Sequence, residues 1–176
     1  GVTLATPNKD EMKVDLVLSK EVPFSLLEKT VYDEGFNYDD SHINFKSEIG
    51  HGLMILVGVE ETDSETDIDW LVGKVSQMRI FDDEKGIMNL SVKDVDGEIM
   101  AISQFTLFAS TKKGNRPSWY RAARHDISVP LYELFCDKLS TALGKPVGRG
   151  VFGADMKVEL INDGPVTIII DSKNKE

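Results

Sequence analysis

Two short polar segments interrupt apolar parts of the sequence, and they hold the side chains best suited to chemistry. Ser103, Gln104 and Thr106 fall within the apolar run of residues 98–108, where an unpaired polar group would be costly. The Ser and Thr hydroxyls offer a nucleophile, or they satisfy nearby backbone groups. The second segment, Asn162–Thr167, contains the sequence Asn-Asp-Gly-Pro, which is typical of a hairpin turn. Neither segment identifies a function by itself.

Several other kinds of chemistry are disfavoured. His42, His51 and His125 are widely spaced and lack a paired acid at ligand spacing, so we predict no metal site. Cys136 lies within the apolar stripe of a predicted helix, where it is expected to act as a small core residue. The glycine spacings of nucleotide-binding loops are missing as well. The sequence therefore predicts no cofactor.

Basic side chains are concentrated in one part of an otherwise acidic chain. The 176 residues carry 20 Lys and Arg against 30 Asp and Glu, for a net charge of −10, which argues against a protein that binds many nucleic-acid phosphates. Residues 107–149 nevertheless hold eight basic and three acidic side chains. Lys112, Lys113 and Arg116 belong to a stretch without any acid. This stretch is either a solvated loop or a binding site for a phosphate-bearing partner.

Two amphipathic helices are predicted. Thr62 and Glu65 have the spacing of a capping box, and apolar residues follow them at helical spacing. Ser128 is expected to cap the second helix, with Pro130 in its first turn. Gly144 is expected to end this helix, because glycine adopts the left-handed conformation that closes many helices.

Short apolar runs bounded by turn residues predict strands between and around these helices. This order of elements is typical of one α/β domain with a mixed sheet and helices packed on it. Residues 1–11 are polar and aperiodic, so they are expected to form a disordered tail or an appended remnant. Residues 12–176 are expected to form the single domain. The expected strands cover residues 13–19, 53–59, 79–81, 98–108, 156–161 and 166–171.

Four motifs follow one another in the second half of the chain. They read SQFTL at residues 103–107, GNRP at 114–117, FGADM at 152–156 and NDGPVT at 162–167. Together they resemble the D-aminoacyl-tRNA deacylases, also called D-tyrosyl-tRNA deacylases, over roughly three quarters of the chain, from residue 48 onward. That family usually opens with a strand reading Gln-Arg-Val, where this chain has Val17–Ser19. Residues 21–47 form a longer, divergent segment.

The resemblance implies a fold, a reaction and an assembly. The fold would be deacylase-like, a single α/β domain whose mixed, mostly antiparallel sheet curves into a barrel-like core with two main helices. The family hydrolyses the ester that joins a D-amino acid to the terminal adenosine of tRNA, and it also removes glycine. It is a homodimer with its site at the subunit interface. A Gly-cis-Pro dipeptide, here Gly164 and Pro165, would enter the partner's pocket and exclude L side chains.

The same resemblance assigns roles to the remaining motif residues. Ser103, Gln104, Phe105 and Thr106 form the expected catalytic segment. We favour a water assisted by the ribose 2′-hydroxyl, with backbone N–H groups near Phe105 and Thr106 stabilising the oxyanion. A nucleophilic Thr106 is the alternative, although no general base is evident beside it. The expected pocket lining is Phe152, Gly153, Ala154 and Met156.

Expectations about partners and location follow from the same features. Lys112, Lys113 and Arg116 would meet the phosphates of the tRNA acceptor end. Aminoacylated tRNA is the expected partner, with no DNA and no membrane, since no apolar run approaches the ~20 residues that span a bilayer. A single cysteine and the lack of a secretory signal favour a cytoplasmic location. Three other functions stay open: an esterase for small substrates, a non-catalytic tRNA-binding module and, least favoured, a purely structural dimer.

Overall fold

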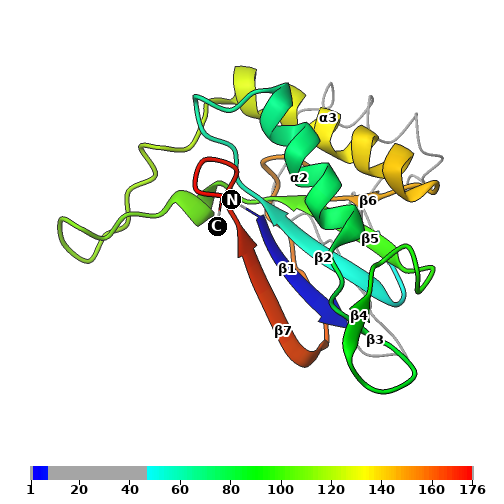
Figure 1. The fold of residues 1–176 in the computed structure, drawn as a ribbon. Helices are drawn as coiled ribbons and strands as arrows, with labels where there is room; N and C mark the ends of the chain where they lie inside the picture. The colour runs from blue at the N-terminus through cyan, green and yellow to red at the C-terminus, as the bar shows by residue number, and fades with distance from the viewer. Residues whose placement is uncertain (1, 8–46, 176) are drawn as a thin grey trace, which may run out of the picture.

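The computed structural model describes residues 2–7 and 47–175 (Figure 1). The strand expected over residues 13–19 and all but the last residue of the divergent segment 21–47 lie outside the described residues. No helix of the described part is long and apolar enough to cross a bilayer. The elements in chain order are β1 (Val2–Pro7), β2 (Gly52–Val57), α2 (Glu65–Gln77), β3 (Phe81–Asp82), β4 (Met88–Leu90), β5 (Glu98–Ser103), the 3₁₀ helix η1 (Phe105–Phe108), α3 (His125–Leu143), β6 (Gly148–Arg149) and β7 (Asn162–Ile170).

Five strands form one sheet in the order β6-β5-β2-β1-β7. Strand β1 is antiparallel to both β2 and β7, whereas β2 with β5 and β5 with β6 are parallel. The sheet is therefore mixed as predicted, but antiparallel pairs do not predominate. Among the described strands β6 and β7 remain as edges, so the sheet is open and the predicted barrel-like closure is not seen. Figure 1 shows the cyan β2 between the blue β1 and the green β5.

The first residues of the chain depart from their prediction. Residues 2–7 form β1, which lies between β2 and β7 and pairs with both of them. The disordered tail predicted over residues 1–11 is thus wrong for this strand. Its sequence, VTLATP, contains β-branched residues, which strands favour, but it is too short to show a clear period.

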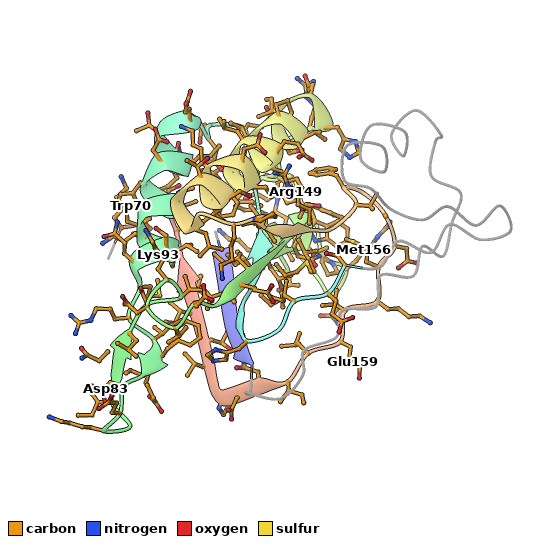
Figure 2. The ribbon with its side chains drawn as sticks, turned by 90° about the vertical axis from the view of Figure 1, so that its right-hand side faces the viewer. Trp70, Asp83, Lys93, Arg149, Met156 and Glu159 are labelled. Carbon is orange, nitrogen blue, oxygen red and sulfur yellow. The ribbon has the colours of Figure 1, made fainter. Side chains whose placement is uncertain are left out.

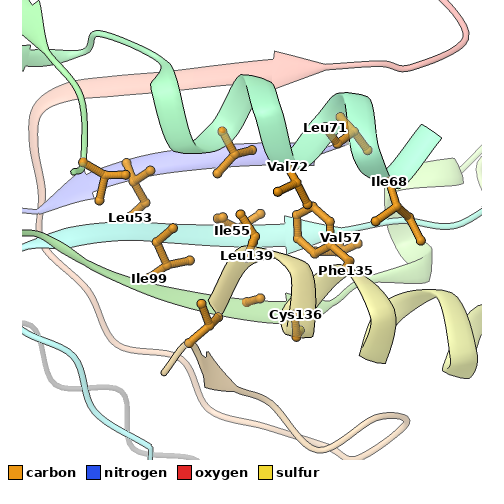
Figure 3. Close-up of a cluster of buried hydrophobic side chains, with 14 of the residues drawn as sticks. Leu53, Ile55, Val57, Ile68, Leu71, Val72, Ile99, Phe135, Cys136 and Leu139 are labelled. Carbon is orange, nitrogen blue, oxygen red and sulfur yellow. The ribbon is translucent and has the colours of Figure 1, made fainter. Parts of the chain in front are cut away.

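The two faces of the central strands carry separate cores, because side chains alternate along a strand. Leu53 and Ile55 belong to a cluster that includes Phe135 of α3 and the apolar face of α2 (Figure 3). Met54 and Met100 belong to a second cluster, which the segment after β6 covers. Both faces of β2 are therefore buried, and this agrees with its continuous apolar sequence.

Helix α2 forms as predicted, but its cap lies two residues further along the chain. Ser64 and Asp67 form the capping box, in which the Ser64 N–H donates to the Asp67 carboxylate over 2.9 Å. Thr62, the predicted cap, donates to Glu60 instead. Asp67 also accepts a hydrogen bond from Lys173 over 2.9 Å. One carboxylate therefore connects the segment after β7 to the start of α2.

Helix α3 begins earlier than predicted and ends where predicted. It starts at His125, so Ser128 lies inside the helix and donates to the Arg124 carbonyl over 3.0 Å. Pro130 consequently falls beyond the first turn. Gly144 ends the helix in the left-handed conformation, with φ of 79°, which glycine adopts without a Cβ clash.

Three predicted strands differ from the structure. The apolar run 98–108 divides into β5, which stops at Ser103, and the 3₁₀ helix η1. Residues 156–161 form no strand until Asn162 begins β7. The strand expected over residues 79–81 begins only at its last residue. Short strands such as β4 and β6 had no sequence signal, because two or three residues show no period.

We predict that Asp67→Asn lowers the free energy of unfolding at neutral pH by about 2 kcal/mol. Burial opposes ionisation of Asp67, but its hydrogen bonds with Lys173 and Ser64 outweigh this effect and lower its pKa from 3.8 to about 2. A carboxyl with a depressed folded-state pKa stabilises the protein above its unfolded pKa, and this contribution disappears as the pH falls through the folded value. In urea denaturation, the difference between variant and parent should therefore shrink between about pH 5 and pH 2.

Asp69→Asn is the matched control on the same helix. The Asp69 side chain is 59% exposed in its ion pair with Lys138, and exposed pairs contribute little to stability. An equal loss in both variants, or a loss for Asp67→Asn that does not change with pH, would contradict the prediction.

Candidate active site

A cavity of about 480 Å³ lies where β2 and β5 end. Because these strands are parallel, with Val57 paired to Ser103, their carboxyl ends meet at one edge of the sheet, the usual position of ligand sites in α/β folds. Ser103, Gln104 and Phe105 line one side of the cavity. The predicted lining residues Phe152, Gly153, Ala154 and Met156 are on it as well.

The turn that follows β5 positions backbone N–H groups at this edge of the sheet. The Gln104 N–H still donates to the Val57 carbonyl over 2.7 Å, so the chain follows β2 to this point. It then enters η1, after which the Ala109 N–H donates back to the Thr106 carbonyl over 3.0 Å. The N–H groups of Phe105 and Thr106 open the turn, and neither has a backbone partner among residues 2–7 and 47–175. Two adjacent donors of this kind are suited to an oxyanion.

The Thr106 side chain is not part of the cavity lining. Its Oγ1 accepts a hydrogen bond from Gln104 Nε2 over 2.5 Å. Gln104 and Phe105 line the cavity, whereas Thr106 does not. No titratable side chain of the described residues hydrogen-bonds to the Thr106 hydroxyl, so no base is placed to activate it. This arrangement favours Thr106 as a support for Gln104.

Sequence reasoning missed the most deeply buried residue of the cavity, Tyr132. Its hydroxyl donates to the Ala101 carbonyl over 2.9 Å and lies 3.3 Å from the Gly150 carbonyl. Burial raises the pKa of the Tyr132 phenol well above its ordinary value, so the hydroxyl stays a donor. The bonds tie α3 to β5 and to the segment after β6. A tyrosine in an apolar helical stripe was the available signal, because a buried hydroxyl needs a partner.

His125 is the second residue that the sequence did not assign to the site. It lines the cavity, and its ring stands edge-on to Phe152 with 5.4 Å between the ring centroids. A lone histidine without a ligand or triad partner nearby in the sequence carried no signal. The other unpredicted lining residues are Val57, Val59, Ile102, Ala122, Ala123, Ser128, Asp155 and Val158.

Arg149, labelled in Figure 2, connects β6 to α3. Its guanidinium donates to Glu133 over 2.6 Å and to Asp137 over 2.5 Å. Burial opposes the charge, but the hydrogen bond with Asp137 and the charges of both carboxylates raise the pKa of Arg149 above its ordinary value. Phe152 follows three residues later, so these ion pairs help to hold the second side of the cavity.

Gly164 and Pro165 are exposed and do not line this cavity. The peptide bond between them is cis, and Gly164 has φ of 131°. They lie in a bulge of β7. Ala5 of β1 pairs with Thr167 and Pro7 pairs with Asn162, so two residues of β1 stand opposite five residues of β7. The hairpin turn predicted for this sequence is therefore a bulge within one strand.

The bulge is too far away to reach the cavity of its own chain. Strands β2 and β1 separate β7 from β5, which places the two about 14 Å apart at the usual strand spacing. Val2 is paired with Val57 at the cavity end of β2, and Ala5 lies three residues further along β1. The bulge lies beyond Ala5, so it is also displaced from the cavity by about 10 Å or more along the strands. Within one chain, the two groups of predicted site residues are thus not brought together.

The predicted tRNA-binding residues Lys112, Lys113 and Arg116 are exposed on the loop between η1 and α3. None of them forms an ion pair within the part of the chain that the structure describes, whereas Arg121 and Arg124 pair with glutamates. Ala122 and Ala123, at the end of the loop before α3, line the cavity. The three cations are therefore available to an anion outside the cavity.

Comparison with known proteins identifies the family. A family model described as D-Tyr-tRNA(Tyr) deacylase matches residues 39–171. The chain belongs to the D-aminoacyl-tRNA deacylase family. The curated D-aminoacyl-tRNA deacylases of Bacteroides thetaiotaomicron and Bacteroides fragilis are 66% and 67% identical to it over 131 residues, which cover 74% of this chain and 87% of each relative. The family and the enzyme class predicted from the motifs, an ester hydrolase, are confirmed.

Solved structures show that this D-aminoacyl-tRNA deacylase family member shares its fold with other proteins. A c-Myc DNA unwinding element binding protein superposes with a TM-score of 0.70 at 27% identity, over 96% of both chains. A probable eukaryotic D-amino acid tRNA deacylase superposes with a TM-score of 0.67 over 95% of this chain and 96% of its own. Its 16% identity makes this a likeness of fold alone. The predicted α/β domain with two main helices is confirmed.

We predict that Thr106→Ala retains most of the deacylase turnover, with less than about a tenfold loss of kcat. The hydroxyl lies outside the cavity lining and its observed partner is Gln104, so its removal loosens a support without deleting a reacting group. Single-turnover hydrolysis of an aminoacyl-tRNA by the folded variant measures this. Thr106→Ser keeps an acceptor for Gln104 and should recover what is lost. A loss beyond about a thousandfold in Thr106→Ala would instead identify a nucleophile.

Proposed function

We propose that this protein hydrolyses D-aminoacyl-tRNA to free D-amino acid and intact tRNA, that it also removes glycine, and that it spares L-aminoacyl-tRNA. The observation that supports this most is the cavity, whose sides come from two of the four motifs, at residues 103–105 and 152–156. Its volume of about 480 Å³ lies in the usual range for sites that take small ligands. An aminoacyl group and part of the terminal adenosine are ligands of this size.

The reaction asks little of the protein, because an ester is already activated. A water molecule adds to the carbonyl carbon, the bond to the ribose oxygen breaks, and a proton from the water passes to that oxygen. The N–H groups of Phe105 and Thr106 stabilise the charge that develops on the carbonyl oxygen, an effect typically worth ~3 kcal/mol per donor. The neighbouring ribose 2′-hydroxyl assists the water, since no described base stands beside Thr106.

Selection against L-amino acids requires a second copy of the chain. In a homodimer, the bulge of one copy enters the cavity of the other, and the carbonyl groups of Gly164 and its neighbours accept hydrogen bonds from the substrate ammonium. The backbone occupies the space that an L side chain needs, while glycine, with hydrogen in that position, is accepted. Glycine is required at residue 164, where φ is 131° and a Cβ would lie 3.0 Å from Val166 Cγ2.

The basic loop binds the phosphates of the tRNA acceptor end through Lys112, Lys113 and Arg116. A cavity of about 480 Å³ holds only the end of such a substrate, so the preceding nucleotides continue over the protein surface. The three cations are exposed on the loop that ends at the lining residues Ala122 and Ala123, and they form no ion pair in the described part of the chain. The phosphates of the nucleotides that precede the terminal adenosine form ion pairs with these cations.

The deciding experiment compares D-tyrosyl-tRNA with L-tyrosyl-tRNA, each against a control without protein. We expect rapid hydrolysis of the D ester, hydrolysis of glycyl-tRNA as well, and no loss of the L ester above the control. Hydrolysis of both tyrosyl esters would support the hydrolase activity but contradict selection against L-amino acids by Gly164 and Pro165. Hydrolysis of neither ester by folded protein would reject the proposal and favour a tRNA-binding module without catalysis.

Replacing Lys112, Lys113 and Arg116 together by Gln should raise KM for D-tyrosyl-tRNA and flatten its dependence on salt, with little change in kcat. Each lost phosphate contact lowers the slope of log affinity against log salt by about one. The matched control replaces three exposed lysines elsewhere, at positions 74, 85 and 93, and should leave the slope unchanged. Equal slopes for the two triple variants would mean that the loop binds no phosphates and is only a solvated surface.

A further inference from the structure

Two adjacent aromatic residues on the basic loop have no place in the cavity. Trp119 and Tyr120 are both exposed, Tyr120 to 77%, and neither is a lining residue. Figure 1 shows the yellow-green loop that carries them extending away from the sheet and the helices. Burial therefore does not account for this aromatic pair, and we asked what it contacts outside the chain.

The loop holds the pair in a fixed position. Reciprocal hydrogen bonds between the backbones of Ser110 and Ser118, over 2.8 and 3.0 Å, close the loop immediately before Trp119. On the other side, the Ala123 N–H donates to the Val59 carbonyl over 2.8 Å. The pair thus occupies a short turn between two points of attachment, and a ligand that stacks on it orders little additional chain.

The aromatic surface is continuous with the cavity. Trp119 meets Phe105 edge to face, with 5.5 Å between the ring centroids and 71° between the planes, and Phe105 is itself a lining residue that is 56% exposed. Arg121 is occupied within the loop, since it pairs with Glu60 over 2.9 Å and lies above the ring of Phe108. Phe105 and Trp119 therefore lead from the cavity to the outside, and the exposed Tyr120 follows Trp119 in the chain.

The loop combines exposed aromatic rings with cations that form no ion pair among the described residues, and this combination favours one class of ligand. Lys112, Lys113 and Arg116 lie on the same loop, in a stretch without an acid, on a chain of net charge −10. Unpaired nucleotides present flat bases and phosphates in alternation, and proteins bind them with aromatic platforms and basic side chains. An apolar peptide has no use for the cations, and a duplex hides the faces of its bases.

We propose that Trp119 and Tyr120 form a stacking surface for the unpaired nucleotides that precede the terminal adenosine of the substrate. This inference rests on the proposed function, because it takes the aminoacylated adenosine to occupy the cavity. The bases stack on the two rings while Lys112, Lys113 and Arg116 bind the phosphates between them. The loop then contributes affinity for the nucleic acid and takes no part in the chemical step.

The kinetic test compares D-tyrosyl-tRNA with D-tyrosyl-adenosine, which has the same ester without the preceding nucleotides. We expect Trp119→Ala and Tyr120→Ala each to lower kcat/KM for the tRNA about tenfold, through KM, as loss of one stacked base does. Both variants should leave hydrolysis of the adenosine ester unchanged, and Trp119→Phe should recover most of the activity on tRNA. Trp70→Phe on α2 (Figure 2) is the control, because Trp70 packs against the main core and contacts Lys74 and Lys175 instead.

Two kinetic outcomes would overturn the proposal. An equal loss on both substrates would mean that the pair only shapes the cavity through Phe105. No loss on either substrate would leave the aromatic pair without a part in recognition. Dissociation of a dimer in Trp119→Ala or Tyr120→Ala, measured by sedimentation, would also reject stacking, because the loop would then be an interface between copies.

A binding measurement separates this inference from the proposed function. The chain has two tryptophans, so Trp70→Phe leaves Trp119 as the only indole. We expect the trinucleotide CCA to quench its fluorescence, and Tyr120→Ala to weaken that titration about tenfold. Unchanged fluorescence up to millimolar CCA would overturn the stacking surface even in an active deacylase. If CCA quenches the fluorescence but the protein hydrolyses no aminoacyl ester, the stacking surface is supported and the proposed function is rejected.

Discussion

The parallel pairing of β2 with β5 determines where the rest of the site lies. The ladder runs from Gly52 opposite Glu98 to Val57 opposite Ser103, so the polar segment that follows β5 leaves the sheet beside the end of β2. Apolar clusters bury both faces of these strands. A slip of one residue would exchange the two faces along the whole strand. The register, and with it the position of the cavity, is therefore fixed by the cores on both sides.

The second side of the cavity depends on α3, and it is held by polar groups. Tyr132 reaches the carbonyls of Ala101 and Gly150 from inside the protein, and Arg149 pairs with two carboxylates of the same helix. The buried Tyr132 hydroxyl would cost more without a partner than the net value of its hydrogen bond, whereas the carboxylates that pair with Arg149 are exposed. One helix thus links the end of β5 to the segment that carries Phe152, and the two sides of the cavity keep their spacing.

Short motifs predicted most of the cavity because their residues are contiguous and chemically unusual for their elements. The lining from Ser103 to Phe105 and from Phe152 to Met156 follows directly from two of them. Tyr132 and His125 could not be found in this way, since tertiary packing alone brings α3 to the cavity. The boundary between β5 and η1 was missed because Phe105–Phe108 continues the apolar pattern of the strand. The sheet closure was expected from family resemblance, and the described strands leave the sheet open.

The bulge of β7 exposes the Gly-Pro element without disturbing the pairing of the rest of the strand with β1. The ladder with β1 resumes at Thr167 opposite Ala5, and beyond it Ile168 and Ile170 pack against the main core. Residues 163–166 can therefore gain or lose a residue without turning these isoleucines to the other face, which a strand inside a regular ladder does not allow. The geometry of the exposed Gly-Pro element is thus set apart from the ladder, and a change within it would leave the register of the sheet unaltered.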